Sequence, residues 1–321
     1  MTEFEIIKKY FASRSIKRAD VIESIGDDAA IVAVPKNQQL VITTDTLIAG
    51  RHFPHETSPF DIGHKSLAVN LSDLAAMGAT PHWVTMALTL PKADEVWIKH
   101  FCDGFFELAH RYQVELIGGD LTEGPLSITI QALGCIPAQK ALLRKGAKPS
   151  DLLYVTGTLG DAGLALKCLK EKHSLDPAYK EMIFAKLNRP EPCVEIGEKL
   201  RGIAHAAIDI SDGLAADLKH ILEKSGVGAI LHVDQLPLSE ALIHSLSHEE
   251  AIALALTSGD DYELCFTVPE NNRLALENIF STLSCRLTCV GKITKEKNLS
   301  MYDQGKKYHG PRFGYQHFKS N

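Results

Sequence analysis

The stretch Asn70-Leu71-Ser72-Asp73-Leu74-Ala75-Ala76-Met77-Gly78-Ala79 closes a long helical pattern that begins near Asp61. An apolar stripe of leucines at helical spacing lets this helix pack on a core: Leu67, Leu71 and Leu74. The adjacent polar face holds residues at i, i+4 and i+7: Ser66, Asn70 and Asp73. The pattern therefore predicts a helix that packs on a core and directs one carboxylate toward a site.

Strand and helix patterns alternate on both sides of this helix. In the first half the expected strands are Ala29–Val34, Gln39–Thr44, Val84–Leu90, Val114–Ile117 and Leu126–Ile136, with a helix over Asp94–Tyr112. In the second half they are Leu152–Thr156, Ala206–Ile210, Ala229–Val233 and Glu263–Val268, with a helix from Leu214. Interleaved strands and helices predict α/β layers in both halves. The turn-rich segment Gly146–Ser150 suggests domains over residues 1–148 and 149–321.

Composition excludes several classes of function. The formal net charge of −6 argues against broad electrostatic binding to nucleic acid, which needs a basic surface. Apolar runs are too short to span a membrane, and the N-terminus lacks a secretory pattern. It predicts instead an amphipathic helix with Phe4, Ile7, Lys8 and Phe11 on one face. Seven cysteines without a CxxC suggest reduced thiols in a cytoplasmic protein, although zinc on Cys285 and Cys289 stays open.

The aspartates carry the chemical signal, because they recur where strands and turns are expected to meet. They are Asp27 and Asp28 before the first strand, Asp45 and Asp120 at strand ends, Asp73 on the helix, Asp209 and Asp212 around a strand end, and Asp260 and Asp261 before the last strand. Carboxylates that converge repel each other and need cations. Magnesium prefers oxygen ligands and shares them with phosphates. The pattern therefore predicts magnesium ions that hold a triphosphate.

Each motif alone also fits a structural explanation. An aspartate commonly caps a turn, so Asp212 suits the start of the helix near Leu214, and Asp73 suits a solvated surface. The backbone amides of a second segment, Gly157-Thr158-Leu159-Gly160, are at a helix start and could bind an anion. This segment is not a P-loop, because it lacks the lysine and the serine or threonine of that motif. Arg144 suits either a phosphate or solvent. His52 alone suits a structural role.

Taken together, six segments resemble the thiamine-monophosphate kinases, a family of the superfamily that includes aminoimidazole ribonucleotide synthetase. In chain order the segments are Gly26–Ala30, Thr43–Asp45, Asn70–Ala79, Gly118–Asp120, Asp209–Leu214 and Ser258–Leu264. The resemblance covers almost the whole chain. The stretch Gly259-Asp260-Asp261-Tyr262-Glu263-Leu264 is the part most particular to the kinases.

The resemblance implies roles for individual positions. The magnesium-binding positions would be Asp28, Thr43, Thr44, Asp45, Asp73, Asp120, Asp209 and Asp212. The ATP contacts would be Gly119, Asp120, Arg144 and Ser211. The positions near thiamine monophosphate would be His52, Glu263 and Tyr315. Gln316 stands where the family pattern leads us to expect Asp. The chain therefore departs from that pattern next to Tyr315, so the resemblance supports Tyr315 less than it supports the aspartates.

The family fold implies two α/β domains, with dimerisation through the N-terminal sheets and the nucleotide at a subunit or domain junction. The implied reaction is direct transfer of the γ-phosphoryl group of ATP to thiamine monophosphate, with several magnesium ions and no protein nucleophile. A phosphate monoester is largely dianionic at neutral pH, so its oxygen needs no strong general base. Two alternatives are an ATP-dependent ring-closing ligase of the same superfamily and a non-catalytic nucleotide-binding protein.

Overall fold

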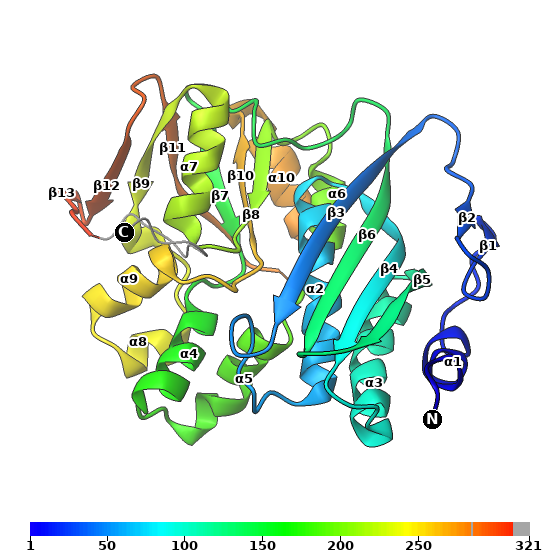
Figure 1. The fold of residues 1–321 in the computed structure, drawn as a ribbon. Helices are drawn as coiled ribbons and strands as arrows, with labels where there is room; N and C mark the ends of the chain where they lie inside the picture. The colour runs from blue at the N-terminus through cyan, green and yellow to red at the C-terminus, as the bar shows by residue number, and fades with distance from the viewer. Residues whose placement is uncertain (284, 311–321) are drawn as a thin grey trace. The chain divides into compact units, whose positions relative to one another are not determined.

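The computed structural model describes residues 1–283 and 285–310, which form two compact units (Figure 1). Unit 1 comprises Met1–Ala75 and Ala79–Ala141, and unit 2 comprises Ala76–Gly78 and the chain from Leu142 onward. Each unit has its own sheet and its own helices, so the expectation of two α/β halves is confirmed. No helix in the described part of the chain is long and apolar enough to span a bilayer.

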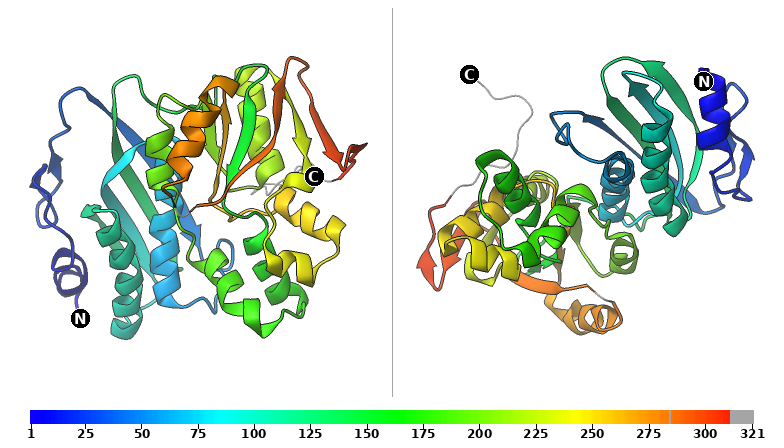
Figure 2. Two further views of the ribbon diagram at one scale, coloured as in Figure 1. Left: turned by 180° about the vertical axis from the view of Figure 1, so that it is seen from behind. Right: turned by 90° about the horizontal axis from the view of Figure 1, so that it is seen from below.

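Unit 1 is a four-stranded sheet in the order β3-β6-β4-β5, in which only the β4–β5 pair is parallel. Its elements are α1 (Glu3–Ile6), a π-helix (Ile7–Ala12), β1 (Val21–Glu23), β2 (Ile31–Val32), β3 (Gln38–Ile48), α2 (Pro59–Ala76), β4 (Thr80–Leu90), α3 (Glu95–Arg111), β5 (Glu115–Glu123) and β6 (Ser127–Pro137). Helices α2 and α3 cover the same face of this sheet (Figures 1 and 2).

Two expected strand ends in unit 1 are wrong. Asp45 lies inside β3, because the strand continues to Ile48 in register with β6. Asp120 lies inside β5, which runs on to Glu123 along β4. In both cases the backbone of a polar segment finds a continuous partner strand, and pairing extends the strand beyond its apolar part. The first expected strand is also shorter than predicted, since only Ile31–Val32 pairs.

The N-terminal helix differs from the amphipathic pattern expected for it. After Ile6 the backbone widens into a π-helix, which changes the spacing of the residues on each face. The buried side chains are consequently Ile6, Tyr10 and Phe11, whereas Phe4 is 78% exposed. Only Phe11 of the predicted apolar face is buried.

Helices α2 and α3 of unit 1 approach each other through two glycines. A Cβ atom on Gly63 would lie 2.0 Å from the carbonyl oxygen of Phe101, and one on Gly104 would lie 1.9 Å from that of Phe60. Both distances are far below van der Waals contact, so only glycine allows this backbone approach. The close packing fixes α2, which carries Asn70 and Asp73, against its neighbours.

Unit 2 is built on a seven-stranded sheet in the order β13-β12-β9-β11-β7-β10-β8, antiparallel except for β12 beside β9. Its strands are β7 (Leu152–Thr156), β8 (Ala206–Asp209), β9 (Gly228–His232), β10 (Leu264–Val268), β11 (Leu287–Thr294), β12 (Leu299–Asp303) and β13 (Lys306–Lys307). Its helices are α4 (Asp161–Glu171), α5 (Pro177–Asn188), α6 (Val194–Leu200), α7 (Leu214–Ser225), α8 (Glu240–Ser245), α9 (His248–Thr257) and α10 (Arg273–Phe280).

Alternate side chains of the unit 2 strands enter two different cores. Val155 of β7 and Cys265 of β10 join the buried cluster that includes α7 and α9. Their neighbours Tyr154 and Phe266 face the other way, where Phe266 stacks against Phe280 of α10 at 6.5 Å between ring centroids. Because helices cover both faces, β10 is buried throughout and β7 is buried from Leu153 to Thr156.

Replacing Gly104 with alanine tests the glycine contact. In an ordinary helix this change is stabilising by about 1 kcal/mol, because alanine is the better helix former. Here the added methyl group meets the Phe60 carbonyl, so we expect Gly104→Ala to lower the free energy of unfolding by roughly 1–3 kcal/mol. Urea unfolding measures the change. Glu107→Ala, at an exposed position of α3, is the control, and an unchanged or stabilised Gly104→Ala protein would contradict the close approach.

Candidate active site

Unit 1 brings three of the predicted metal-binding residues together where β3 faces α2. The Thr43 hydroxyl donates a hydrogen bond to the carboxylate of Asp73. Asp45, two residues farther along β3, donates its backbone N–H to the side-chain oxygen of Asn70 at 3.1 Å. Asn70 is fully buried and is itself held by the Ser66 carbonyl, which accepts from its amide at 3.0 Å. The predicted polar face of α2 therefore serves to attach this helix to β3.

The carboxylates of Asp45 and Asp73 influence each other. Burial, and then the negative charge of Asp73, raise the pKa of Asp45 to about 6. A bound cation would relieve this repulsion, and two carboxylates with water or phosphate oxygens satisfy magnesium. The donors Thr43, Asp45 and Asp73 are all oxygen atoms, so they fit magnesium in type. Among residues 1–283 and 285–310, no group of three or more carboxylate, histidine or cysteine side chains is arranged to hold a metal.

The other predicted residues of unit 1 lie apart from this acidic pair. Thr44 is exposed, because alternation turns it to the sheet face opposite Thr43 and Asp45. Gly119 and Asp120 lie on β5, three strand positions from β3, which corresponds to about 14 Å. One magnesium ion cannot bind directly to carboxylates that far apart. Asp120 therefore belongs to a different metal position from Asp45 if both bind metal.

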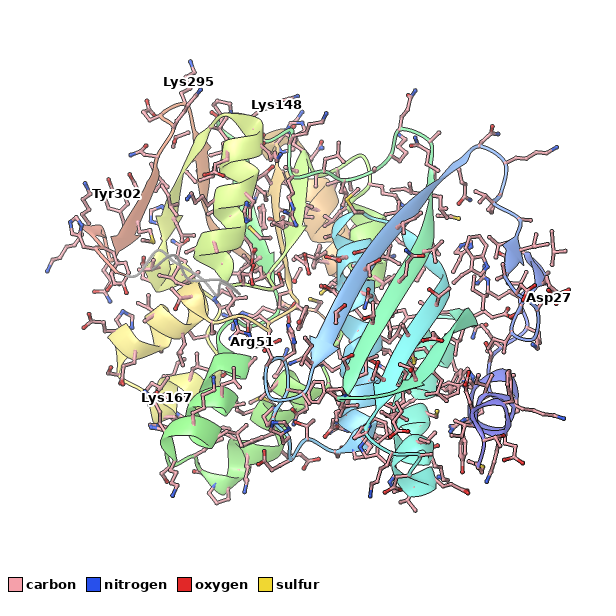
Figure 3. The ribbon with its side chains drawn as sticks, in the orientation of Figure 1. Asp27, Arg51, Lys148, Lys167, Lys295 and Tyr302 are labelled. Atoms are coloured by element: carbon pink, nitrogen blue, oxygen red, sulfur yellow. The ribbon has the colours of Figure 1, made fainter. Side chains whose placement is uncertain are left out.

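Asp28 lies exposed on the loop between β1 and β2, where its backbone N–H donates to the Asp27 side chain at 2.8 Å. Figure 3 shows Asp27 on this hairpin, at the β5 side of unit 1. Residues of the hairpin pack with Trp83 of β4 and Ile117 of β5. The acids of unit 1 thus form a β3 group, with Asp45 and Asp73, and a β5 side, with Asp28 and Asp120.

His52 lies just beyond β3, next to Arg51 (Figure 3). Its Nδ1 atom accepts a hydrogen bond from the Ile48 backbone N–H at 2.9 Å, which closes the turn after the strand. This contact supplies the structural role that the sequence left open. The role of His52 toward the substrate stays a prediction.

In unit 2, two of the segments that carry the family resemblance are hydrogen-bonded to each other at one end of the sheet. Asp260 and Tyr262 donate backbone N–H groups to the carbonyls of Ser211 and Ile210, at 3.0 and 2.8 Å. A Cβ atom on Gly259 would lie 2.4 Å from the Ser211 carbonyl oxygen, so this approach requires glycine. Asp209 ends β8 as predicted and is paired with Leu264. The Asp209–Gly213 and Ser258–Glu263 segments therefore form one joined loop pair.

A buried aspartate that sequence reasoning missed holds the first of these loops. Asp217, on α7, accepts backbone N–H groups of Ser211, Asp212 and Gly213 on one carboxylate oxygen. Burial raises the pKa of Asp217 to about 7, although the three amide donors oppose that rise. The N-cap of α7 is Gly213, with no side-chain cap, so Asp212 does not cap this helix.

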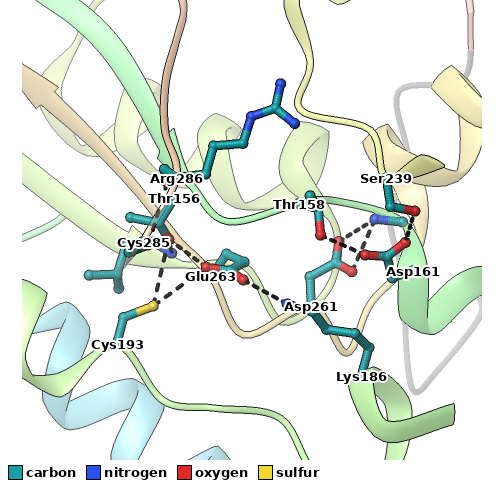
Figure 4. Close-up of polar contacts among 12 residues, drawn as sticks. Thr156, Thr158, Asp161, Lys186, Cys193, Ser239, Asp261, Glu263, Cys285 and Arg286 are labelled. Atoms are coloured by element: carbon teal, nitrogen blue, oxygen red, sulfur yellow. Dashed lines mark hydrogen bonds and ion pairs between the residues drawn. The ribbon is translucent and has the colours of Figure 1, made fainter. Parts of the chain in front are cut away.

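Glu263 lies in a buried polar network of unit 2 (Figure 4). Its carboxylate accepts from the Thr156 hydroxyl at 2.7 Å and pairs with the Lys186 ammonium at 3.3 Å. Burial alone would lower the pKa of Lys186, but the neighbouring carboxylates of Glu263, Asp161 and Asp261 raise it. A Cβ atom on Gly157 would lie 1.9 Å from the Glu263 carboxylate, so glycine at this left-handed position makes room for the network.

The amide at the start of α4 is already occupied. Gly160 donates its backbone N–H to both oxygens of Asp261, each at 3.0 Å. Asp161, the first residue of the helix, accepts from the hydroxyls of Thr158 and Ser239 at 2.6 and 2.5 Å (Figure 4). An anion on the amides of Gly157–Gly160 would have to displace the Asp261 carboxylate, which argues against that alternative.

The predicted nucleotide contact Arg144 lies away from this loop pair. The Arg144 carbonyl accepts from the Ser225 hydroxyl at the last residue of α7, whereas Ser211 precedes the first residue of that helix. A helix of this length separates its ends by about 16 Å, more than an arginine side chain spans. Tyr315 lies outside the described residues.

Substituting Asp45 tests the electrostatic cost of the β3 group. The folded state favours the protonated form of Asp45. The free energy of unfolding therefore falls as the pH rises from the ordinary pKa of an aspartate through about 6. We therefore expect Asp45→Asn, in a metal chelator, to raise the free energy of unfolding at pH 8 by roughly 1–2 kcal/mol. The gain should shrink as the pH falls toward 5.

Thermal and urea unfolding at both pH values measure this difference. Asp27→Asn, at an exposed position of the same unit, is the matched control and should change stability by less than about 0.5 kcal/mol. A destabilised Asp45→Asn protein at pH 8 without metal would contradict the prediction that the charged form of Asp45 is unfavourable in the folded state.

Comparison with known proteins identifies the family. Residues 26–136 match the N-terminal domain of AIR synthase related proteins, and residues 148–304 match their C-terminal domain. The thiamine-monophosphate kinase of Salmonella typhimurium is 46% identical over 318 residues, 98% of each chain. The crystal structure of thiamine-monophosphate kinase from Stenotrophomonas maltophilia has a TM-score of 0.88 at 46% identity and covers 96% of this chain and 98% of that one.

A solved structure of AaThiL in complex with AMPPCP and TMP has a TM-score of 0.76 at 32% identity and covers 92% of each chain. These matches extend over nearly the whole chain and agree with the resemblance carried by its acidic segments. The chain belongs to the thiamine-monophosphate kinase family, within the AIR synthase related proteins.

Proposed function

We propose that this chain transfers the γ-phosphoryl group of ATP to thiamine monophosphate and releases thiamine diphosphate and ADP. The observation that carries the proposal is the β3 group, in which Asp45 and Asp73 are held together by contacts to Thr43 and Asn70. Family membership supports the substrates, since AaThiL was solved with AMPPCP, an ATP analogue, and TMP. Curated relatives with full-length matches are kinases, which disfavours a ring-closing ligase.

In the proposed step, an oxygen of the substrate phosphate attacks the γ-phosphorus and the bond to the bridging oxygen of ADP breaks. The nucleophile is already anionic, so the protein has to position two anions rather than remove a proton. Magnesium, when bound, would neutralise charge on the transferred group. Asp45 and Asp73 would hold it in unit 1, and Asp209 and Asp212 in unit 2, while Ser211 contacts the nucleotide.

We further propose that unit 1 binds ATP and magnesium and mediates dimerisation, and that unit 2 completes the nucleotide and substrate site. Asp28, Thr44, Gly119, Asp120 and Arg144 keep their proposed roles as metal or ATP contacts, and His52, Glu263 and Tyr315 theirs toward the substrate. All seven cysteines are free thiols, which fits the proposed cytoplasmic location.

The deciding experiment incubates the purified protein with ATP, magnesium and thiamine monophosphate and separates the products by chromatography. Equal amounts of thiamine diphosphate and ADP, both lost on chelation of magnesium, are the expected result. ADP with free phosphate alone would indicate the ligase chemistry. Binding of ATP without turnover would indicate a non-catalytic protein.

The same assay tests the role of the β3 group. We expect Asp73→Asn to lower kcat/KM by about 100-fold, because the substitution removes a charge that holds the cation. His52→Asn should cost less, since no proton transfer through a histidine is required. Circular dichroism checks that both variants fold. Near-normal turnover of Asp73→Asn at low magnesium would contradict the metal role.

A homodimer would use the face of the unit 1 sheet opposite α2 and α3. On β3 this face exposes Leu40, Ile42 and Ile48, with 38%, 54% and 45% of their surface accessible. We expect the wild-type protein to run as a dimer in light scattering, and Ile42→Glu to shift it toward monomer by burying a charge. Leu274→Glu, at a 74% exposed position on α10, is the control. A monomeric wild type would refute the pairing.

A further inference from the structure

Asp217 makes an unusual set of contacts for a buried carboxylate. One oxygen, Oδ2, accepts the backbone N–H groups of three consecutive residues, Ser211, Asp212 and Gly213, at 3.1, 3.0 and 3.1 Å. Only 3% of the Asp217 surface is exposed. All three donors belong to the turn between β8 and α7, which carries two of the proposed ligand contacts.

Asp217 supplies one acceptor for all three amides of this turn. Consecutive N–H groups at a helix start attract anions, phosphate included. Gly213 has a φ of 112°, and a Cβ atom there would lie 2.8 Å from the backbone of Thr257, so the turn is tightly enclosed. The carboxylate thus satisfies three donors and fixes the backbone at the same time.

The fixed backbone determines where the two side chains project. The carbonyl of Ser211 points the other way and accepts from Asp260, so the residue is held from both sides. Asp217 itself is enclosed in the core of unit 2 and presents no free face to a ligand. Its effect on a ligand must therefore pass through Ser211 and Asp212.

We propose that Asp217 is a positioning residue for nucleotide and metal binding. It holds the Ser211-Asp212-Gly213 turn in the one conformation that presents the Ser211 hydroxyl and the Asp212 carboxylate to magnesium-bound ATP. Because Asp217 already accepts from the three backbone N–H groups, side-chain oxygens and cations contact the phosphates in place of the backbone. The inference rests on the proposed function, which assigns Ser211 and Asp212 to the nucleotide site.

A purely structural role would predict a loss of stability and nothing more, so a matched buried carboxylate is needed as control. Asp151 is 3% exposed and accepts from the Lys148 backbone N–H at 2.8 Å and contacts the His205 ring at 2.9 Å. Asp151 precedes Leu152, which pairs with Val268 at the end of β10. Asp209, next to the Ser211 turn, pairs with Leu264 at the start of β10. Asp151 therefore lies at the opposite end of the same sheet.

The experiment titrates wild type, Asp217→Ala, Asp217→Asn and Asp151→Ala with magnesium-AMPPCP by calorimetry and records their melting temperatures. We expect Asp217→Ala to weaken binding by about 10-fold or more, as loss of a partner behind a metal ligand does. Asp217→Asn retains an acceptor oxygen and should lose less, about threefold. Asp151→Ala should lower the melting temperature comparably but leave affinity within about twofold of wild type.

Unchanged affinity of Asp217→Ala, or an equal loss in Asp151→Ala, would overturn the proposal. If Asp217→Ala does not fold, Asp217→Asn decides, and wild-type affinity in that variant would overturn the proposal too. Calorimetry keeps this test separate from the reaction. A wild type that binds magnesium-AMPPCP but makes no thiamine diphosphate would refute the proposed function while leaving the positioning test valid.

Discussion

The contact between β3 and α2 keeps two carboxylates in a place where they repel each other. Burial of Asp45, and then the negative charge of Asp73, raise the pKa of Asp45 to about 6, so the charged form is disfavoured there. The Thr43 hydroxyl and the Asn70 side chain link the strand to the helix at this point, and Gly63 and Gly104 allow α2 to pack closely on α3. Packing energy in unit 1 thus maintains an unfavourable charge arrangement that a cation can use.

In unit 2, buried aspartates accept hydrogen bonds from backbone N–H groups of loops. Backbone N–H groups at the start of a helix favour anions, and here the anions are aspartate side chains of the same unit. Asp217 takes three N–H groups before α7, and Asp261 takes the Gly160 N–H before α4. These four N–H groups are therefore already paired inside the protein. The acidic composition of the chain is therefore consistent with binding an anionic nucleotide.

The sequence was most informative where apolar periodicity and backbone pairing coincide. Leu152–Thr156 forms the predicted strand because its apolar run is buried on both faces and pairs with a strand on each side. The apolar pattern predicted the strand ends wrongly where polar residues continue a strand. Asp45 and Asp120 were expected at strand ends, but β3 and β5 continue beyond them. Apolar spacing says nothing about how far a partner strand extends.

The site was predictable in its chemistry but not in its geometry. Repeated aspartates in glycine-rich turns identified the Asp209–Gly213 segment, yet nothing in the letters distinguished Asp217 from a solvated helix residue. Its role depends on three amides converging on one oxygen, a consequence of the turn at Gly213. Likewise Lys186 and Thr156 lie far in sequence from Glu263, and only the folded sheet of unit 2 brings them to it.

The distribution of acids inside unit 1 constrains any mechanism for this family member. Asp45 and Asp120 of one chain stand on opposite edge strands, about 14 Å apart, too far for these two side chains to bind one ion together. A triphosphate with several cations is an extended polyanion and can contact separate carboxylate groups along its length. In unit 1 the carboxylates therefore stand in two separate places, and the contacts of Thr43 and Asn70 hold the β3 group at its edge of the sheet.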